Sequence, residues 1–132
     1  MKDSQEGRRD RLNALGFSLF LWLVLALPGE SLPGLPGRFD HLLPEHLDKW
    51  IHGALFVAEA FFLYRFFRHF PKQTWFRPLA ATWVVGAVFA LGSELSQSLV
   101  PGRHADVWDV LADLAGIAIW TLGLGAVHRI LK

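Results

Sequence analysis

Four apolar blocks constrain this chain more than any other feature of its sequence. Each holds about 20 residues, the length that an α-helix needs to cross the hydrocarbon core of a bilayer. We expect helices over residues of about 12–28, 48–67, 79–100 and 105–127. Soluble amphipathic helices carry a polar stripe along their whole length, which the first block lacks entirely. The sequence therefore predicts an all-α, polytopic membrane protein with four transmembrane helices in a small bundle.

The segments between the blocks consist of typical helix-breaking residues. Proline and glycine recur through residues 29–47, and Pro101-Gly102 stops the third block. Residues 1–10 are polar, and we expect them to be mobile. A basic start before an apolar run is also typical of a signal peptide, but Pro28 stands where a cleavage site needs a small residue. We interpret residues 1–132 as a single membrane domain.

Lysine and arginine are divided unequally between the two sides of the predicted bundle. Ten of the 13 lie on the side that holds both termini and the 68–78 connection, and three lie on the other side. Cytoplasmic loops are enriched in these residues. We therefore expect both termini in the cytoplasm. The chain has no cysteine and a formal net charge of +1, so the sequence excludes disulfides and gives no reason to expect a nucleic-acid partner.

Ionisable side chains inside three of the predicted helices require an explanation, because each is costly in a bilayer. Within each helix they recur at spacings of three or four, which puts them on one face, and they gather toward one end of the bundle. The predicted functional set is Asp48, Lys49, His52, Glu94, Gln97, Arg103, Asp106, Asp109 and Asp113. We expect the helices to turn these faces toward each other and form one site. Lys49 and Arg103 are the natural partners of its acids.

Gly116 follows Asp113 by three residues, and we expect it to let another helix approach closely. Structural roles remain open for several of the polar residues. Polar contacts between helices, helix capping and anchoring at the interface would account for Gln97, Asp48 and Lys49. Glu59 has no firm assignment.

The order and spacing of these motifs resemble the VanZ-like family of bacterial membrane proteins. The resemblance rests on Asp48-Lys49-x-x-His52, Glu94-x-x-Gln97 and Arg103-x-x-Asp106-x-x-Asp109, which continues to Asp113 and Gly116, and it covers about residues 48–125. The family commonly has asparagine in place of Asp113. It usually has an aromatic residue four positions after the histidine, often tyrosine, and in this chain that residue is Phe56. The resemblance implies a four-helix protein of the bacterial cytoplasmic membrane. Its founding member is associated with low-level resistance to the glycopeptide teicoplanin.

Three functions remain open. The first is a non-enzymatic envelope protein whose outward polar cluster binds a lipid-linked cell-wall intermediate or a glycopeptide. The second is a membrane enzyme that acts on a lipid-linked substrate through His52 and its neighbouring carboxylates. The third is a proton-linked transporter subunit, which would require a homo-oligomer. One histidine with carboxylates is compatible with a metal, but no known metal or catalytic spacing matches. We therefore predict no metal and no cofactor, and membrane lipids as partners.

Overall fold

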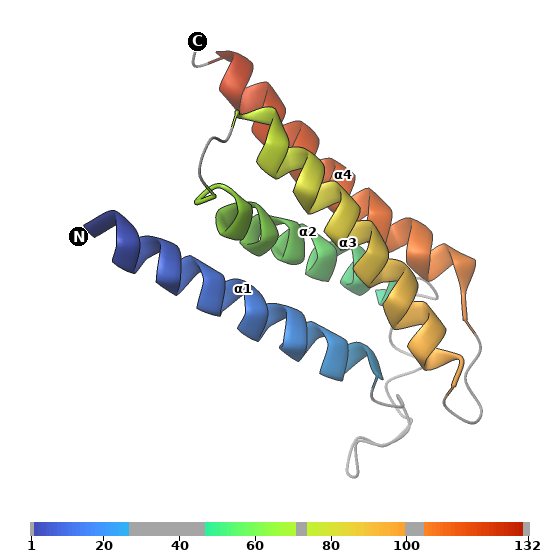
Figure 1. Ribbon diagram of the computed structural model, residues 1–132. Coiled ribbons are helices and arrows are strands. Elements are labelled where there is room, and N and C mark those ends of the chain that lie inside the picture. The colour runs from blue at the N-terminus through green and yellow to red at the C-terminus, as the bar shows by residue number, and fades with distance from the viewer. Residues whose placement is uncertain (1, 27–46, 71–73, 100–104, 131–132) are drawn as a thin grey trace.

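Four helices make up the regular structure of the part of the chain that the computed structural model describes, residues 2–26, 47–70, 74–99 and 105–130. They are α1 (Lys2–Ala26), α2 (Leu47–Phe67), α3 (Phe76–Gln97) and α4 (Val107–Ile130). The all-α prediction is confirmed. The ends of α1 and α4 marked N and C lie at the same end of the bundle, as Figure 1 shows.

The predicted helix bounds are close for α2, α3 and α4 and wrong at the start of α1. That helix begins at Lys2, ten residues before the predicted start at 12. The first turns are held by ion pairs to α2, which the local sequence does not reveal. The predicted ends at 28 and 100 lie outside the described residues.

In the described part of the chain, three helices are long and apolar enough to cross a membrane: Lys49–Phe67, Phe76–Gln97 and Val107–His128. The outer surface of α3 explains why a bilayer suits this bundle. Val84, Val88, Leu91 and Leu95 repeat at spacings of four, three and four, which aligns them on one side of the helix. They are between 59% and 68% exposed. Exposing such an apolar stripe to water would be unfavourable, whereas contact with lipid chains is favourable.

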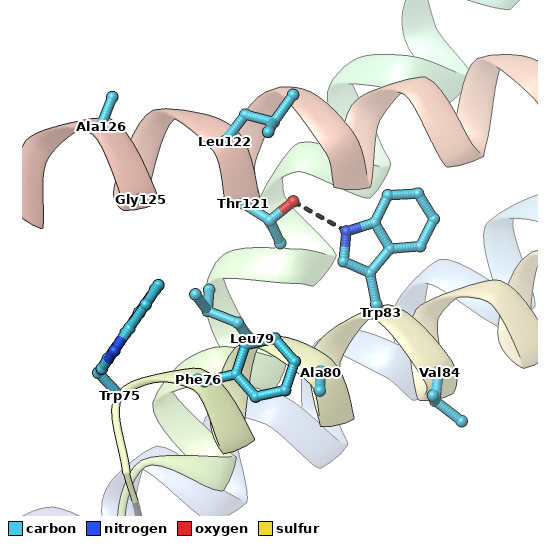
Figure 2. Close-up of a pocket in the computed structure, with 10 residues that line it drawn as sticks. All are labelled: Trp75, Phe76, Leu79, Ala80, Trp83, Val84, Thr121, Leu122, Gly125 and Ala126. Atoms are coloured by element: carbon cyan, nitrogen blue, oxygen red, sulfur yellow. Dashed lines mark hydrogen bonds between the residues drawn. The ribbon is translucent and has the colours of Figure 1, made fainter. Parts of the chain in front are cut away.

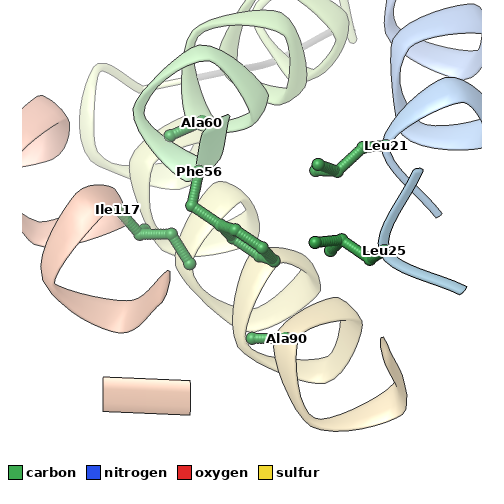
Figure 3. Packing of buried hydrophobic residues seen from close by; sticks show 6 residues of the cluster. All are labelled: Leu21, Leu25, Phe56, Ala60, Ala90 and Ile117. Carbon is green, nitrogen blue, oxygen red and sulfur yellow. The ribbon is translucent and has the colours of Figure 1, made fainter. Parts of the chain in front are cut away.

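The core is small and lies where α2 contacts the other three helices. Phe56 on α2 is fully buried between Ile117 of α4 and Ala90 of α3, and Leu21 and Leu25 of α1 close the remaining side (Figure 3). The core therefore ties all four helices together through α2.

Helices α2 and α4 approach each other most closely at a pair of glycines. A Cβ atom on Gly116 would lie 2.2 Å from the carbonyl oxygen of Gly53, a distance that real Cβ atoms do not reach. Only glycine permits this approach. The contact brings the polar ends of α2 and α4 into register, and so positions the site described next.

Candidate functional site

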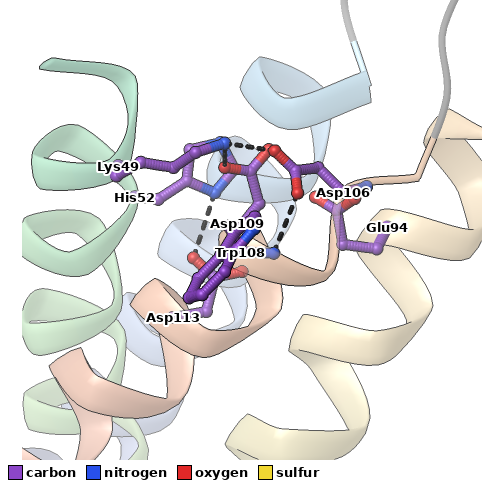
Figure 4. Close-up of polar contacts among 7 residues, drawn as sticks. All are labelled: Lys49, His52, Glu94, Asp106, Trp108, Asp109 and Asp113. Atoms are coloured by element: carbon purple, nitrogen blue, oxygen red, sulfur yellow. Dashed lines mark hydrogen bonds and ion pairs between the residues drawn. The ribbon is translucent and has the colours of Figure 1, made fainter. Parts of the chain in front are cut away.

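One end of the bundle carries a group of ionisable side chains from three helices. Figure 4 shows them converging between α2, α3 and α4. The polar cluster, as we call it below, consists of Lys49 and His52 from α2, Glu94 from α3, Asp109 and Asp113 from α4, and Asp106 just before α4. One ligand atom each of His52, Glu94 and Asp109 lies within 4.8 Å of the other two. The three polar faces that the sequence indicates therefore meet.

Lys49 joins α2 to the start of α4. Its Nζ donates to Asp106 Oδ2 at 2.5 Å and also to Asp109 Oδ1. Asp106 precedes the first turn of α4, and its Oδ1 accepts the backbone N–H of Trp108 at 2.9 Å, as a helix cap does. The hydrogen bond from Lys49, together with that of Trp108, holds the pKa of the Asp106 carboxyl below its usual range.

Glu94 fastens the end of α3 to the same place. Its Oε2 accepts the backbone N–H of Asp106 at 2.9 Å. Among the described residues, its buried Oε1 has no hydrogen-bond partner, and the same holds for Nε2 of Gln97, one turn further along α3. Buried polar atoms without a partner are rare and costly in proteins. Glu94 Oε1 and Gln97 Nε2 are therefore candidates to bind a ligand.

His52 and Asp113 form a pair at the deepest point of the polar cluster. His52 Nδ1 lies 3.0 Å from Asp113 Oδ1, and Asp113 is fully buried. With Asp113 ionised, Nδ1 carries the hydrogen and Nε2 is left as an acceptor. Oδ2 of Asp113 has no hydrogen-bond partner in the part of the chain that the structure describes. The pair therefore fixes the orientation of the imidazole ring and leaves one basic nitrogen.

Two of the predicted site residues cannot be located in this geometry. Arg103 lies outside the described residues. Asp48 belongs to the first turn of α2, but its side chain is outside the described part of the structure. Gln97 is buried near the end of α3.

A second group of charges, missed in the sequence, lies at the opposite end of α2. Asp10 of α1 is 2% exposed and accepts from Arg65 at 2.8 Å and from His69 at 2.7 Å. Glu6 pairs with Arg68 at 2.6 Å. We call these five residues the arginine cluster. Glu6 and Asp10 are four apart on one helical face, a signal that could have indicated packing of the first turns.

Glu59 lies apart from both clusters, in the middle of α2. It is fully buried, and its Oε1 accepts a hydrogen bond from Ser18 Oγ of α1 at 2.5 Å. Its place is therefore at the contact of α1 with α2.

Several apolar hollows lie on the outer surface of the described part of the bundle. One, of about 700 Å³, lies between α3 and α4 near Trp75 and Leu122, and is far from the polar cluster (Figure 2). Trp83 Nε1 donates to Thr121 Oγ1 at 3.0 Å on its floor. A second, of about 380 Å³, lies between α2 and α4 and begins at Lys49. We call the second hollow the α2–α4 groove.

An all-α bundle with three described helices that are long and apolar enough to cross a membrane, and with partly buried ionisable groups at one end, is typical of a polytopic membrane protein. The chain belongs to the VanZ/LLP1 family, whose family model matches residues 27–128. The resemblance inferred from the motifs is thereby confirmed. Searches of the curated proteins and of the solved structures returned no match.

Proposed function

We propose that this protein binds a lipid-bearing ligand of the bacterial cell envelope, with the ligand's polar head at the polar cluster and its chain in the α2–α4 groove. One observation carries the proposal: Lys49 belongs to both places. Its ammonium bonds Asp106 and Asp109, and the same residue lines the groove together with Gly53, Ala54, Ala112 and Ala115. A polar head and an apolar chain could therefore bind side by side.

The size of the groove is consistent with part of an acyl or polyprenyl chain. Apart from Lys49, the residues that line the groove are apolar. Glycine and alanine leave the space, because their side chains on the facing sides of α2 and α4 are small. Small side chains of this kind also leave room for lipid chains in membrane proteins. A lipid-linked cell-wall intermediate and an acylated glycopeptide share this chemistry of a polar head and an apolar chain.

The orientation of the protein decides on which side a ligand would arrive. The first turns of α1 and the last turns of α4 lie at one end of the bundle (Figure 1), which is also the end of the arginine cluster, and the polar cluster lies at the other end of α2. Because lysine and arginine are retained in the cytoplasm, we infer that both termini are cytoplasmic and that the polar cluster faces outward. This orientation requires α1 to be a fourth transmembrane helix. Its exposed side carries Leu12, Leu15 and Leu19, each about as exposed as the lipid-facing residues of α3.

The orientation can be tested because the natural chain has no cysteine. Gln5 and Ala105 are exposed at the two ends. A membrane-impermeant maleimide should label Ala105→Cys in intact cells and Gln5→Cys only after the membrane is permeabilised. The reverse pattern would mean that the polar cluster faces the cytoplasm.

The binding proposal is tested first by drug susceptibility. Wild type expressed in a susceptible Gram-positive host should raise the inhibitory concentration of teicoplanin and leave that of vancomycin unchanged. Glu94→Gln and Asp109→Asn should abolish the protection while reaching the membrane at wild-type levels. If wild type does not protect, a glycopeptide is not the ligand, and binding of a lipid-linked cell-wall intermediate is then measured on the purified protein.

A matched pair of variants tests the groove. Ala115 and Ala126 are both exposed alanines of α4, but only Ala115 lines the α2–α4 groove. Ala126 lines the hollow between α3 and α4. Ala115→Phe should block ligand binding, and Ala126→Phe should not. Equal effects of the two variants would remove the groove from the proposal.

The His52–Asp113 pair favours a second candidate, an enzyme that acts on the same kind of lipid. An imidazole oriented by a buried carboxylate can accept a proton at its other nitrogen. Purified protein would then turn over a polyprenyl-linked substrate, and His52→Gln would abolish the turnover. Binding without turnover favours the non-enzymatic function.

A further inference from the structure

We propose that His52, Glu94 and Asp109 bind a divalent metal ion of the Mn²⁺ or Zn²⁺ type. This inference rests on the proposed function in that it concerns the same site, but the ion is tested alone, without an envelope ligand. The three residues come from α2, α3 and α4, so the ion would hold together the ends of three helices.

The distances are close to those of a bound metal. Nitrogen and carboxylate ligands bind such metals at about 2.0–2.2 Å, so two ligands of one ion are at most about 4.4 Å apart. The ligand atoms of His52, Glu94 and Asp109 lie within 4.8 Å of one another. Side-chain shifts of less than about 1 Å would therefore bring them to one ion.

The hydrogen bonds of Glu94 and His52 leave one atom of each available for a metal, whereas Oδ1 of Asp109 is bonded to Lys49. Glu94 is 3% exposed, and its buried Oε1 has no hydrogen-bond partner among the residues that the structure describes. The Nδ1 of His52 is held by Asp113, which leaves Nε2 to bind a metal. A histidine ligand that donates its other N–H to a carboxylate is the usual arrangement around protein-bound metals. Asp113 is therefore a positioning residue for His52.

The charges of the polar cluster also favour a cation. Four carboxylates, on Glu94, Asp106, Asp109 and Asp113, meet one lysine and one histidine among the residues that Figure 4 draws. Imidazole suits zinc, and carboxylates suit manganese and magnesium. The mixed set favours Mn²⁺ and Zn²⁺ over Mg²⁺, which prefers oxygen ligands alone.

The arginine cluster provides the contrast within the same chain. Glu6, Asp10 and His69 also lie close enough for a metal. Their oxygens, however, are already bonded to Arg65 and Arg68, at 2.8 Å and 2.6 Å. Two guanidinium groups satisfy these acids and repel a metal ion. We therefore assign the metal to the polar cluster only, and the arginine cluster becomes a matched control.

An ion in the polar cluster would also explain how acidic residues could meet a phosphate head group. Carboxylates repel an anionic head, whereas a divalent ion between them attracts it. Lys49, which bonds Asp109, competes with the ion for this carboxylate.

The first experiment titrates the full-length protein, purified in detergent, with Mn²⁺, Zn²⁺ and Mg²⁺ by calorimetry. We expect one Mn²⁺ or Zn²⁺ per chain and weaker binding of Mg²⁺. His52→Gln and Glu94→Gln should weaken binding at least tenfold, and Asp113→Asn should weaken it by about 10–100-fold, as loss of a supporting carboxylate does elsewhere. Lys49→Gln should strengthen binding, and Asp10→Asn should leave it unchanged. No binding to folded wild type would overturn the proposal, as would binding that only Asp10→Asn weakens.

A second experiment remains decisive if removal of a ligand unfolds the protein. Asp109→Cys keeps a ligand at the site and introduces the chain's one cysteine. With Co²⁺ it should give the absorption band of a cobalt–thiolate bond, and Ala126→Cys should not. Absence of the band in folded Asp109→Cys would overturn the site. Metal binding without teicoplanin protection would contradict the glycopeptide ligand alone, and protection without metal binding would contradict the metal site alone.

Discussion

The carbonyl oxygen of Gly53 occupies the space that a side chain on Gly116 would need. The Cβ atom of an alanine at position 116 would lie 2.2 Å from that oxygen and 3.1 Å from the Cβ of Phe56. The obstacle is backbone, which cannot rotate away as the end of a flexible side chain can. Helices α2 and α4 must therefore separate if this glycine is replaced, and the polar cluster at their ends must loosen.

Gly116→Ala should accordingly destabilise the bundle by about 1–3 kcal/mol, as overpacking does in other cores. The measurement is thermal unfolding of the purified protein in detergent, followed by circular dichroism. Gly123→Ala in the same helix is the control, because nothing lies within 4 Å of a Cβ at that position. The control should keep or slightly raise the melting temperature, since alanine favours helix. Equal melting temperatures of the two variants would contradict the close approach.

Ser18→Ala should weaken the attachment of α1 to α2. The serine hydroxyl donates to the fully buried Glu59, and loss of a partner by a buried acceptor costs about 1–3 kcal/mol. Glu59→Gln should cost less, because the amide oxygen of glutamine can still accept this hydrogen bond. The free energies of unfolding of the two variants are compared in the same detergent. A larger loss in Glu59→Gln would mean that the charge of Glu59, and not this bond, matters.

Acid should release α1 from α2 through Asp10. Burial alone would raise the pKa of Asp10. The hydrogen bonds from Arg65 and His69 and the charges of Arg65 and Arg68 together lower this pKa by more than burial raises it. The pKa of Asp10 in the folded protein is therefore below the ordinary value of 3.8. A carboxyl with a lowered folded pKa stabilises the protein fully above its unfolded pKa, and this stabilisation is lost as the pH falls through the folded value.

Asp10→Asn tests this prediction and should be less stable than wild type at neutral pH. The difference between the two proteins should persist down to about pH 4 and shrink at more acidic pH. Stability is followed by unfolding at each pH, with Glu6 and His69 unchanged in both proteins. A difference that stays constant down to pH 2 would show that the charge of Asp10 does not support the contact.

Asp106 should contribute more as a helix cap than as a charge. Its side chain accepts the N–H of Trp108 and pairs with Lys49. Asp106→Asn keeps an acceptor for that N–H and loses only the charge, whereas Asp106→Ala loses both. The melting temperature should therefore fall further in Asp106→Ala. If Asp106→Asn is as unstable as Asp106→Ala, the ion pair with Lys49 dominates.

Much of this fold was predictable, because membrane helices require long apolar runs and the chain has few ways to arrange four of them. The shared polar faces were predictable for a similar reason: side chains such as Glu94 and Asp109 must avoid lipid. The individual partners were not. Lys49 pairs with Asp106 and Asp109, and His52 pairs with Asp113. These pairings depend on how α2 and α4 are shifted and rotated relative to each other, which in turn depends on the close glycine contact. The start of α1 was missed because its partners are about 60 residues away in the chain.

Helix α2 carries a charged group at each end, and their separation has a consequence for the surrounding lipid. Lys49 and Arg65 are 16 positions apart, or about 24 Å along a helix that rises 1.5 Å per residue. The hydrocarbon layer of an average bilayer is about 30 Å thick. A tilt of α2 would shorten the span further. We therefore expect the bilayer next to α2 to be thinner than average, with lipids of shorter acyl chains around this helix.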